Sequence, residues 1–228
     1  MPVPDATPVT IEVSGEGSIS GLLLKPTDSR ALYVFAHGAG AGMTHASMAA
    51  IAKGLAERGI ASLRYQFLYM ERKSKRPDPP KLAQAAVRAA IAEARRLAPK
   101  LPLFAGGKSF GGRMTSGAQA AASLEDVRGL VFLGFPLHPA GKPTRERADH
   151  LSNVQLPMLF LQGTRDALAE LDELQPVIKS LGKRATLKLY DPADHSFHVP
   201  AKSGRKDPEV LNEILDDFAD WVDTVIAS

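Results

Sequence analysis

The feature that most constrains the fold is a serine flanked by glycines, at the point where a buried strand is expected to meet a helix. The apolar run of residues 101–105 leads into Gly107, and Ser109 is followed by Gly111 and Gly112. Glycines allow a strand and a helix to approach closely, and a sharp turn between them lifts a serine hydroxyl clear of the sheet. The pattern predicts a strand–turn–helix unit with Ser109 at its turn.

The rest of the chain alternates between strand and helix patterns after an opening hairpin. The expected hairpin strands are 9–14 and 19–25, the later strands are 31–36, 60–65, 101–105, 129–134, 156–162 and 186–190, and the helices are 45–58, 82–97, 111–122, 170–181 and 208–226. Strands that alternate with helices indicate an α/β fold with a mostly parallel central sheet, here of about eight strands, and helices on both faces. Loops at the carboxyl ends of parallel strands gather at one edge of the sheet.

We expect one domain over residues 1–228, because a chain of this length can bury a sizeable core and shows no linker. The proline-rich residues 1–8 are expected to form a loose N-terminal arm. Between the strands expected at 129–134 and 156–162 there are only about twenty residues, too few for a helical cap. The sequence therefore predicts an open, shallow site without a cap domain.

Composition excludes several classes of protein. The chain has no cysteine, which removes disulfides, zinc–thiolate sites and a cysteine nucleophile. The net charge is only +3, and no basic face with interleaved aromatic residues is present, so no nucleic-acid partner is expected. No apolar run reaches the length of a membrane span, and the N-terminus lacks the pattern of a secretory signal. We therefore expect a cytoplasmic protein.

Two further residues suited to acyl-transfer chemistry follow later strands. Asp166 comes just after the strand expected at 156–162, and His195 follows the strand that ends at Tyr190. A serine hydroxyl needs a general base, and the base needs a carboxylate to orient it, so these residues form a candidate triad with Ser109. Their order along the chain, Ser, Asp, His, is the one expected when such a triad stands on a doubly wound sheet.

Each of these residues has an alternative interpretation. Asp166 could cap the next helix, and Asp194 is a competing carboxylate beside the histidine. His195 could be a turn histidine held by hydrogen bonds, with His198 as its substitute. We favour His195 because it lies nearer the strand end, which leaves its ring free to reach Ser109.

A glycine-rich loop follows the strand expected at 31–36. Acyl transfer develops negative charge on the former carbonyl oxygen, so fixed N–H donors must face it. We expect these donors to be the backbone N–H groups of Phe110 and Ala39, with Gly38 and Gly40 as alternatives for the second. The loop lacks the Gly-Lys-Ser/Thr ending and the Gly-x-Gly-x-x-Gly spacing of nucleotide-binding loops.

The histidines do not form a pattern typical of metal sites. No His-Glu-x-x-His motif is present, and no carboxylate–histidine cluster has ligand spacing, so neither a metal nor another cofactor is expected. His37 is instead expected to hold the glycine-rich loop through hydrogen bonds.

These motifs resemble those of the α/β-hydrolase superfamily over nearly the whole chain. Within it, the chain is similar to the lidless dienelactone-hydrolase-like group, and to a branch of small predicted hydrolases in bacteria and animals. The resemblance rests on His37-Gly38-Ala39-Gly40-Ala41-Gly42-Met43, Tyr69-Met70-Glu71-Arg72, Arg76-Pro77-Asp78, Gly107-Lys108-Ser109-Phe110-Gly111-Gly112-Arg113, Pro136-Leu137-His138-Pro139 and Asp194-His195-Ser196.

The resemblance implies that Ser109 is the nucleophile, Asp166 the acid and His195 the base of a serine hydrolase that needs no cofactor. Dienelactone hydrolases use a cysteine nucleophile, whereas this chain has a serine, so their substrate does not carry over. The resemblance therefore implies a mechanism rather than a particular substrate.

We expect a small-molecule acyl substrate, such as an ester or a thioester. Candidate residues for contact with it are His37, Gly38, Met43, Tyr69, Arg72 and His138. The loop of residues 66–80 should lie on the catalytic rim, where its basic residues would attract an anionic substrate. Two alternatives stay open: a hydrolase-like scaffold with an idle triad, and an acyltransferase or peptidase with the same triad. The sequence does not choose between a monomer and a homodimer.

Overall fold

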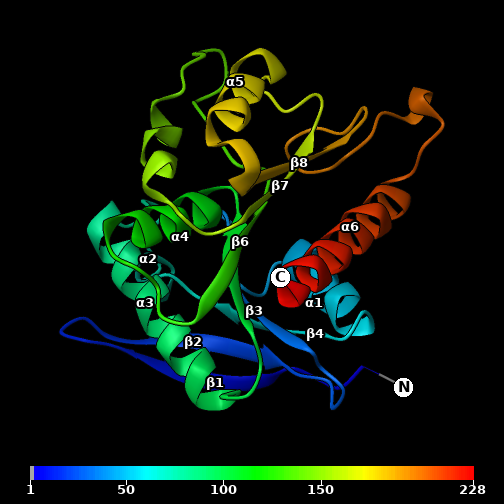
Figure 1. The fold of residues 1–228 in the computed structure, drawn as a ribbon. Helices are drawn as coiled ribbons and strands as arrows, with labels where there is room; N and C mark the ends of the chain where they lie inside the picture. The colour runs from blue at the N-terminus through cyan, green and yellow to red at the C-terminus, as the bar shows by residue number, and fades with distance from the viewer. Residues whose placement is uncertain (1–2) are drawn as a thin grey trace.

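Eight strands of the computed structural model, which describes residues 3–228, form one sheet (Figure 1). The strands are β1 (Thr7–Val13), β2 (Gly17–Leu24), β3 (Ala31–Ala36), β4 (Ile60–Tyr65), β5 (Leu103–Lys108), β6 (Val127–Leu133), β7 (Met158–Gly163) and β8 (Ala185–Tyr190). Their order is β1-β2-β4-β3-β5-β6-β7-β8; the β1–β2 and β2–β4 pairs are antiparallel and the others parallel. The predicted mostly parallel sheet is confirmed.

The first strand begins earlier than the sequence predicts. β1 starts at Thr7 and includes Pro8, which lies opposite Leu22 of β2. Because β1 is an edge strand, a proline that donates no hydrogen bond is tolerated there. The prediction of a loose arm over residues 1–8 is therefore wrong for residues 7–8, and residues 1–2 lie outside the described part of the chain.

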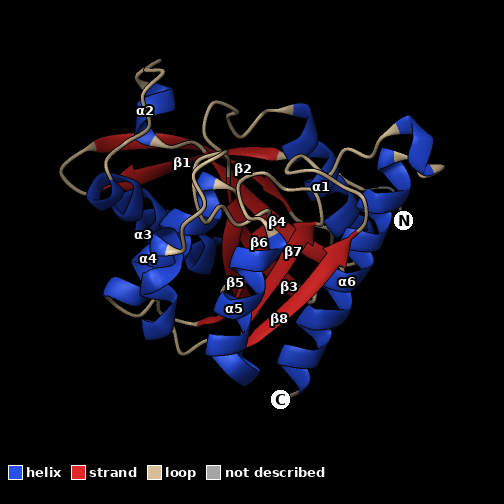
Figure 2. Cartoon of the chain, turned by 90° about the horizontal axis from the view of Figure 1, so that it is seen from above, coloured by secondary structure: helices blue, strands red, loops and turns tan. Residues whose placement is uncertain are grey.

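Helices cover both faces of the sheet, as Figure 2 shows. They are α1 (Ala46–Glu57), α2 (Leu68–Glu71), α3 (Pro80–Leu97), α4 (Phe110–Ala121), α5 (Leu171–Leu181) and α6 (Asp207–Ala227), with the 3₁₀ helices η1 (Glu146–Asn153), η2 (Gly182–Arg184) and η3 (Ala201–Ser203). α1 and α6 lie on one face, and α3, α4 and α5 lie on the other. The predicted helices agree within two residues at each end, whereas α2 and the 3₁₀ helices were not predicted.

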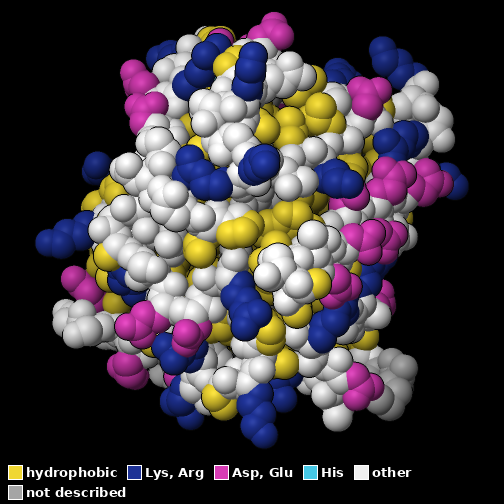
Figure 3. All heavy atoms as spheres, in the orientation of Figure 1, with side chains coloured by type: hydrophobic (Ala, Val, Ile, Leu, Met, Phe, Trp, Pro, Cys, Tyr) yellow, Lys and Arg dark blue, Asp and Glu magenta, His cyan; other side chains and the backbone are white. Residues whose placement is uncertain are grey.

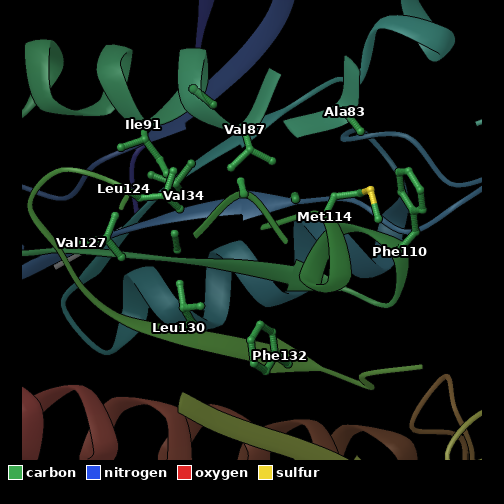
Figure 4. Packing of buried hydrophobic residues seen from close by; sticks show 14 of the residues in the cluster. Val34, Ala83, Val87, Ile91, Phe110, Met114, Leu124, Val127, Leu130 and Phe132 are labelled. Atoms are coloured by element: carbon green, nitrogen blue, oxygen red, sulfur yellow. The ribbon is translucent and has the colours of Figure 1, made fainter. Parts of the chain in front are cut away.

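The core has one layer on each face of the sheet. On the face of α3 and α4, Val87 and Met114 pack above Phe132 of β6 (Figure 4). On the other face, the rings of Tyr33 and Phe218 meet edge to face, with their centroids 4.8 Å apart. Every residue of β3 is buried. A strand buried on both faces accounts for the continuous apolar run that predicted it.

The connection between β6 and β7 contains the 3₁₀ helix η1 as its regular element, and residues 3–228 include no cap domain. Over the same range, none of the helices combines the length and the apolar character needed to cross a membrane. On the face drawn in Figure 3, Lys and Arg side chains are interspersed with Asp and Glu. The absence of a cap over the described chain leaves the loops at the carboxyl ends of the strands open.

Candidate active site

The turn from β5 to α4 holds Ser109 in a strained backbone conformation, with φ 49° and ψ −113°. A side-chain-bearing residue rarely adopts this region, and such strain persists where the surrounding structure enforces it. The enforcing contact comes from Ala36 at the end of β3. A Cβ atom at Gly107 would lie 2.4 Å from the Ala36 carbonyl oxygen, and one at Gly111 would lie 2.6 Å from it. The glycines therefore permit this close approach of strand, turn and helix.

His195 lies between Ser109 and Asp166, within hydrogen-bond distance of both. His195 Nε2 is 2.9 Å from Ser109 Oγ, and His195 Nδ1 is 2.6 Å from Asp166 Oδ2. A carboxylate accepts from Nδ1–H, so Nε2 is left to accept the Ser109 hydroxyl proton. The Asp166 side chain is fully buried, whereas 22% of the His195 side chain is exposed. The arrangement can therefore move a proton from an accessible hydroxyl to an oriented ring.

The Asp166 carboxylate is fixed by a buried glutamine. Gln162 Nε2 donates to Asp166 Oδ2 at 2.5 Å, and the Leu168 N–H donates to Oδ1 at 2.8 Å. The N–H of Phe135 donates to Gln162 Oε1 at 2.9 Å, which sets the orientation of the amide. Gln162 was not among the predicted site residues. A polar residue that closes an otherwise apolar strand four residues before an aspartate was the available signal.

The two alternative residues make other contacts. The Asp194 carboxylate accepts the N–H groups of Ser196 at 2.7 Å and His198 at 3.0 Å, within its own loop. His198 Nδ1 lies 2.8 Å from Asp207 Oδ2, and this pair is exposed. Both residues thus stabilise the segment that follows β8, and the groups that reach Ser109 and Asp166 belong to His195.

His37 links the glycine-rich loop to the segment that follows β4 through two hydrogen bonds. Its Nδ1 donates to the Gly38 carbonyl oxygen at 2.8 Å, and its Nε2 accepts the N–H of Phe67 at 3.1 Å. Burial lowers the pKa of His37, which outweighs the opposing effect of the bond to Gly38. The ring is fully buried. Both ring nitrogens are thus engaged with the backbone, as the prediction of a loop-holding histidine requires, and a contact of His37 with substrate stays a prediction.

The glycine-rich loop comes close to the nucleophile. A Cβ atom at Gly38 would lie 3.8 Å from Ser109 Cβ, and Ala39 is exposed next to it. The N–H of Gly40 donates to Tyr69 Oη at 3.3 Å, so that group is already engaged. Phe110 is the first residue of α4, where backbone N–H groups have no partner inside the helix. The geometry favours the N–H groups of residues 38, 39 and 110 over Gly40 as donors to an anion.

The remaining predicted contact residues lie in different surroundings. Tyr69 is almost fully buried against the loop, and burial raises its pKa. Met43 is buried, and its N–H donates to Gln66 Oε1 at 2.9 Å. Arg72 is exposed and pairs with Glu16 of the opening hairpin at 3.3 Å. These contacts tie Tyr69 to the glycine-rich loop at Gly40, join Met43 to Gln66 and direct Arg72 toward the hairpin.

His138 is fully buried, and a contact of its side chain with substrate stays a prediction. Its Nδ1 donates to the carbonyl oxygen of Pro139 at 2.9 Å.

Five surface cavities of 320 to 480 Å³ are lined by other segments and include none of Ser109, Asp166 and His195. Among residues 3–228, no three His, Asp or Glu side chains are grouped to hold a metal ion.

The sheet order and the serine turn are those of an α/β hydrolase. A family model described as an alpha/beta hydrolase domain matches residues 29–223, and the chain belongs to this family. The predicted resemblance is therefore confirmed. Family membership supports a hydrolase.

Solved structures with the same fold include three hydrolases. Dienelactone hydrolase from Anabaena variabilis is 21% identical, with a TM-score of 0.77 over 96% of this chain and 97% of that one. An α/β serine hydrolase without a lid from Xanthomonas campestris is 22% identical, with a TM-score of 0.73 over 97% and 98%. The esterase domain of a Rhodothermus marinus protein is 15% identical, with a TM-score of 0.70 over 96% and 98%. At these identities the likeness shows the fold.

Proposed function

We propose that the chain is a serine hydrolase that cleaves a carboxylic ester, thioester or related acyl bond. His195 Nε2 takes the proton of Ser109 Oγ, and Oγ attacks the carbonyl carbon of the substrate. The bond to the leaving group breaks, and that group takes the proton from Nε2. Water then attacks the acyl-enzyme with His195 again as base, which releases the acid and restores Ser109.

One observation carries this proposal: the uninterrupted line of hydrogen bonds from Ser109 Oγ through the His195 ring to Asp166, 2.9 Å and 2.6 Å long. The buried carboxylate holds the ring in the tautomer that leaves Nε2 free to accept a proton, and it stabilises the imidazolium that forms. Gln162 keeps that carboxylate in place. A nucleophile, a base and an orienting acid in one line support acyl transfer.

The oxyanion of the tetrahedral intermediate is bound by backbone N–H groups of Ala39 and Phe110. One group belongs to the glycine-rich loop, which comes close to Ser109 at Gly38, and the other stands at the start of α4, where the helix dipole also favours negative charge. His37 and Tyr69 hold the loop through Gly38 and Gly40. A loop fixed before the substrate arrives stabilises the intermediate without reorganisation.

The open rim favours small or flexible acyl substrates. The segment between β6 and β7 does not form a lid in the described chain, and the basic residues Arg72, Lys73, Lys75 and Arg76 of the 66–80 loop are exposed. A thioester or ester that needs little enclosure fits such a site. The same rim admits an alcohol in place of water, so the test must distinguish acyl transfer to an alcohol from hydrolysis.

The test combines active-site labelling with turnover. A fluorophosphonate probe is expected to label the protein once, at Ser109, and Ser109→Ala is expected to abolish labelling. Hydrolysis of p-nitrophenyl esters of increasing chain length, with thioesters alongside, then ranks the acyl groups. The variant should lower kcat by about 10⁴-fold or more.

Absence of labelling of folded protein, where control hydrolases react, would contradict the proposal and favour the idle-scaffold interpretation. Ester products formed with competing alcohols would instead identify an acyltransferase. Cleavage of short peptides at comparable rates would identify a peptidase.

A further inference from the structure

A lysine that the proposed mechanism does not use lies against the loop that carries His195. Lys108 is the last residue of β5 and precedes Ser109 directly. Its side chain crosses toward the loop of residues 191–200, the first part of the connection from β8 to α6. There its Nζ donates to the carbonyl oxygen of His195. A group on the nucleophile's strand thus holds the backbone of the proposed base.

The same ammonium group touches the loop at a second point. Nζ lies 4.6 Å from the centre of the Phe197 ring, a cation–π distance. Phe197 is buried and has a positive φ of 64°, so its backbone conformation also needs support from its surroundings. Two contacts two residues apart, on either side of Ser196, restrain both the position and the tilt of the segment.

The space between the lysine and the imidazole depends on a glycine. A Cβ atom at Gly134, just after β6, would lie 3.1 Å from Lys108 Nζ and 3.3 Å from His195 Nδ1 and Cε1. The ammonium group and the ring therefore both pack against the position that a side chain of Gly134 would occupy. Any side chain there would push one of them away.

Lys108 is half-buried and forms no ion pair within the described chain, although a charge that is removed from water without a partner destabilises a fold. The charged groups that face it are the carboxylates of Asp166 and Asp194, which both raise its pKa, and the titratable ring of His195. Burial has the larger effect and lowers the pKa of Lys108 to about 8. An apolar residue of similar length would occupy this position at a lower cost to stability.

We propose that Lys108 is a positioning residue, whose ammonium group clamps the histidine loop and so sets the distance from His195 Nε2 to Ser109 Oγ. The expected effect of Lys108 on turnover rests on the proposed function, whereas its expected effect on the loop does not. The clamp acts through His195 and touches no reacting atom. A charge-assisted hydrogen bond suits this task because it is stronger than a neutral one.

The first test compares Lys108→Met with Lys53→Met, which alters an exposed lysine on α1. Lys108→Met is expected to lower kcat by about 10- to 100-fold, because a small misplacement of a catalytic group has effects of this size. KM should stay within about threefold, since Lys108 does not touch the substrate. Lys53→Met should match the wild type. A Lys108→Met variant with wild-type kcat would overturn the inference.

The second test uses pH and chemical rescue. In the wild type, kcat should decline by about fivefold as the pH rises through the pKa of Lys108, because the neutral amine is a weaker donor. Lys108→Met should lack this step. Propylammonium chloride should restore part of the activity of Lys108→Ala, whereas tetramethylammonium, which has no N–H, should not. A purely structural lysine predicts the same pH profile in both proteins and no rescue.

The third test does not depend on catalysis. Hydrogen exchange of the peptide that spans residues 191–200 should be faster in Lys108→Met than in the wild type or Lys53→Met, and the melting temperature at pH 7 should not fall. Unchanged exchange would overturn the clamp even in an active enzyme. If the wild type neither reacts with fluorophosphonate nor turns over esters, the proposed function fails, and the exchange result still decides on the clamp.

Discussion

The serine turn and the histidine loop meet at one hydrogen bond, but they are held in place by different kinds of contact. At the serine turn, backbone touches backbone: Gly107 and Gly111 rest on the carbonyl group of Ala36. In the histidine loop of residues 191–200, side chains hold the backbone. The Asp194 carboxylate accepts two N–H groups there, and Lys108 donates to the carbonyl oxygen of His195.

This difference teaches how each region responds to change. A turn built from backbone contacts tolerates only glycine at its tight positions, because any Cβ atom displaces a strand. A loop held by several side chains loses one hydrogen bond at a time, each with a modest net effect. We therefore expect substitutions at the turn to affect the whole fold, and substitutions in the loop to affect catalysis more than stability.

The largest expected effect tests the backbone contact at the turn. Gly111→Ala places a Cβ atom 2.6 Å from the carbonyl oxygen of Ala36, and 2.7 Å from both its carbonyl carbon and its Cβ. Because β3 cannot yield without moving the central sheet, we expect a loss of about 2–3 kcal/mol of stability and a melting temperature lower by about 5–10 °C. Thermal denaturation followed by circular dichroism measures it.

Gly38→Ala is the matched control, since the new Cβ would find no atom nearer than 3.6 Å. It should leave the melting temperature within about 2 °C of the wild type. Equal losses in the two variants would show that the close approach to Ala36 does not limit the turn.

The same difference explains what could be predicted from the sequence. The glycine spacing around Ser109 and the apolar runs of strand length are local sequence patterns, so the turn and the strands of the sheet could be predicted. The order of Ser109, Asp166 and His195 followed from strand ends, because parallel strands bring their carboxyl ends to one edge. The structure places these three side chains within hydrogen-bond distance. Residue spacing alone also located the glycine-rich loop beside Ser109.

The parts that were missed depend on contacts between distant segments. Lys108 occupies the variable position of the serine motif, and only the fold shows that its side chain reaches a loop 87 residues away. Gln162 lies only four residues before Asp166, but the orientation of its amide depends on the N–H of Phe135, 27 residues away. The burial of His37 and His138 likewise follows from packing, which motif spacing does not encode. Edge position, not composition, decided that Pro8 belongs to a strand.

A smaller effect is expected where the histidine loop is held by its own carboxylate. Asp194→Ala removes an acceptor for the N–H groups of Ser196 and His198, which lie 2.7 and 3.0 Å from Oδ1. We expect a loss of about 1 kcal/mol of stability and a decrease in kcat of about tenfold, because the loop loosens while Lys108 still holds it. Steady-state kinetics and urea denaturation measure the two effects.

Asp194→Asn keeps an acceptor oxygen and should recover most of both losses. Stability lost without a change in kcat in Asp194→Ala would contradict the expectation that this loop affects catalysis more than the fold.

The smallest effect is expected at the exposed end of the same loop, where His198 Nδ1 meets Asp207 Oδ2 at 2.8 Å. The hydrogen bond to Asp207 raises the pKa of His198 above 6.5, and the bond from His198 lowers the pKa of Asp207 below 3.8. A raised histidine pKa stabilises the folded chain below pH 6.5, and this contribution is lost as the pH rises through the folded value. A lowered aspartate pKa contributes above pH 3.8 and is lost in stronger acid. The pair therefore stabilises the fold mainly between these limits.

His198→Asn should lower the melting temperature by at most about 2 °C at pH 5.5 and not at pH 8.5, with kcat unchanged within about twofold. The substitution leaves the Asp207 carboxylate free to accept the N–H of Val199, so the start of α6 is kept. An equal deficit at both pH values would mean that the ring acts through packing rather than charge. A tenfold loss of kcat would mean that this end of the loop, and not only the part held by Lys108, sets the position of His195.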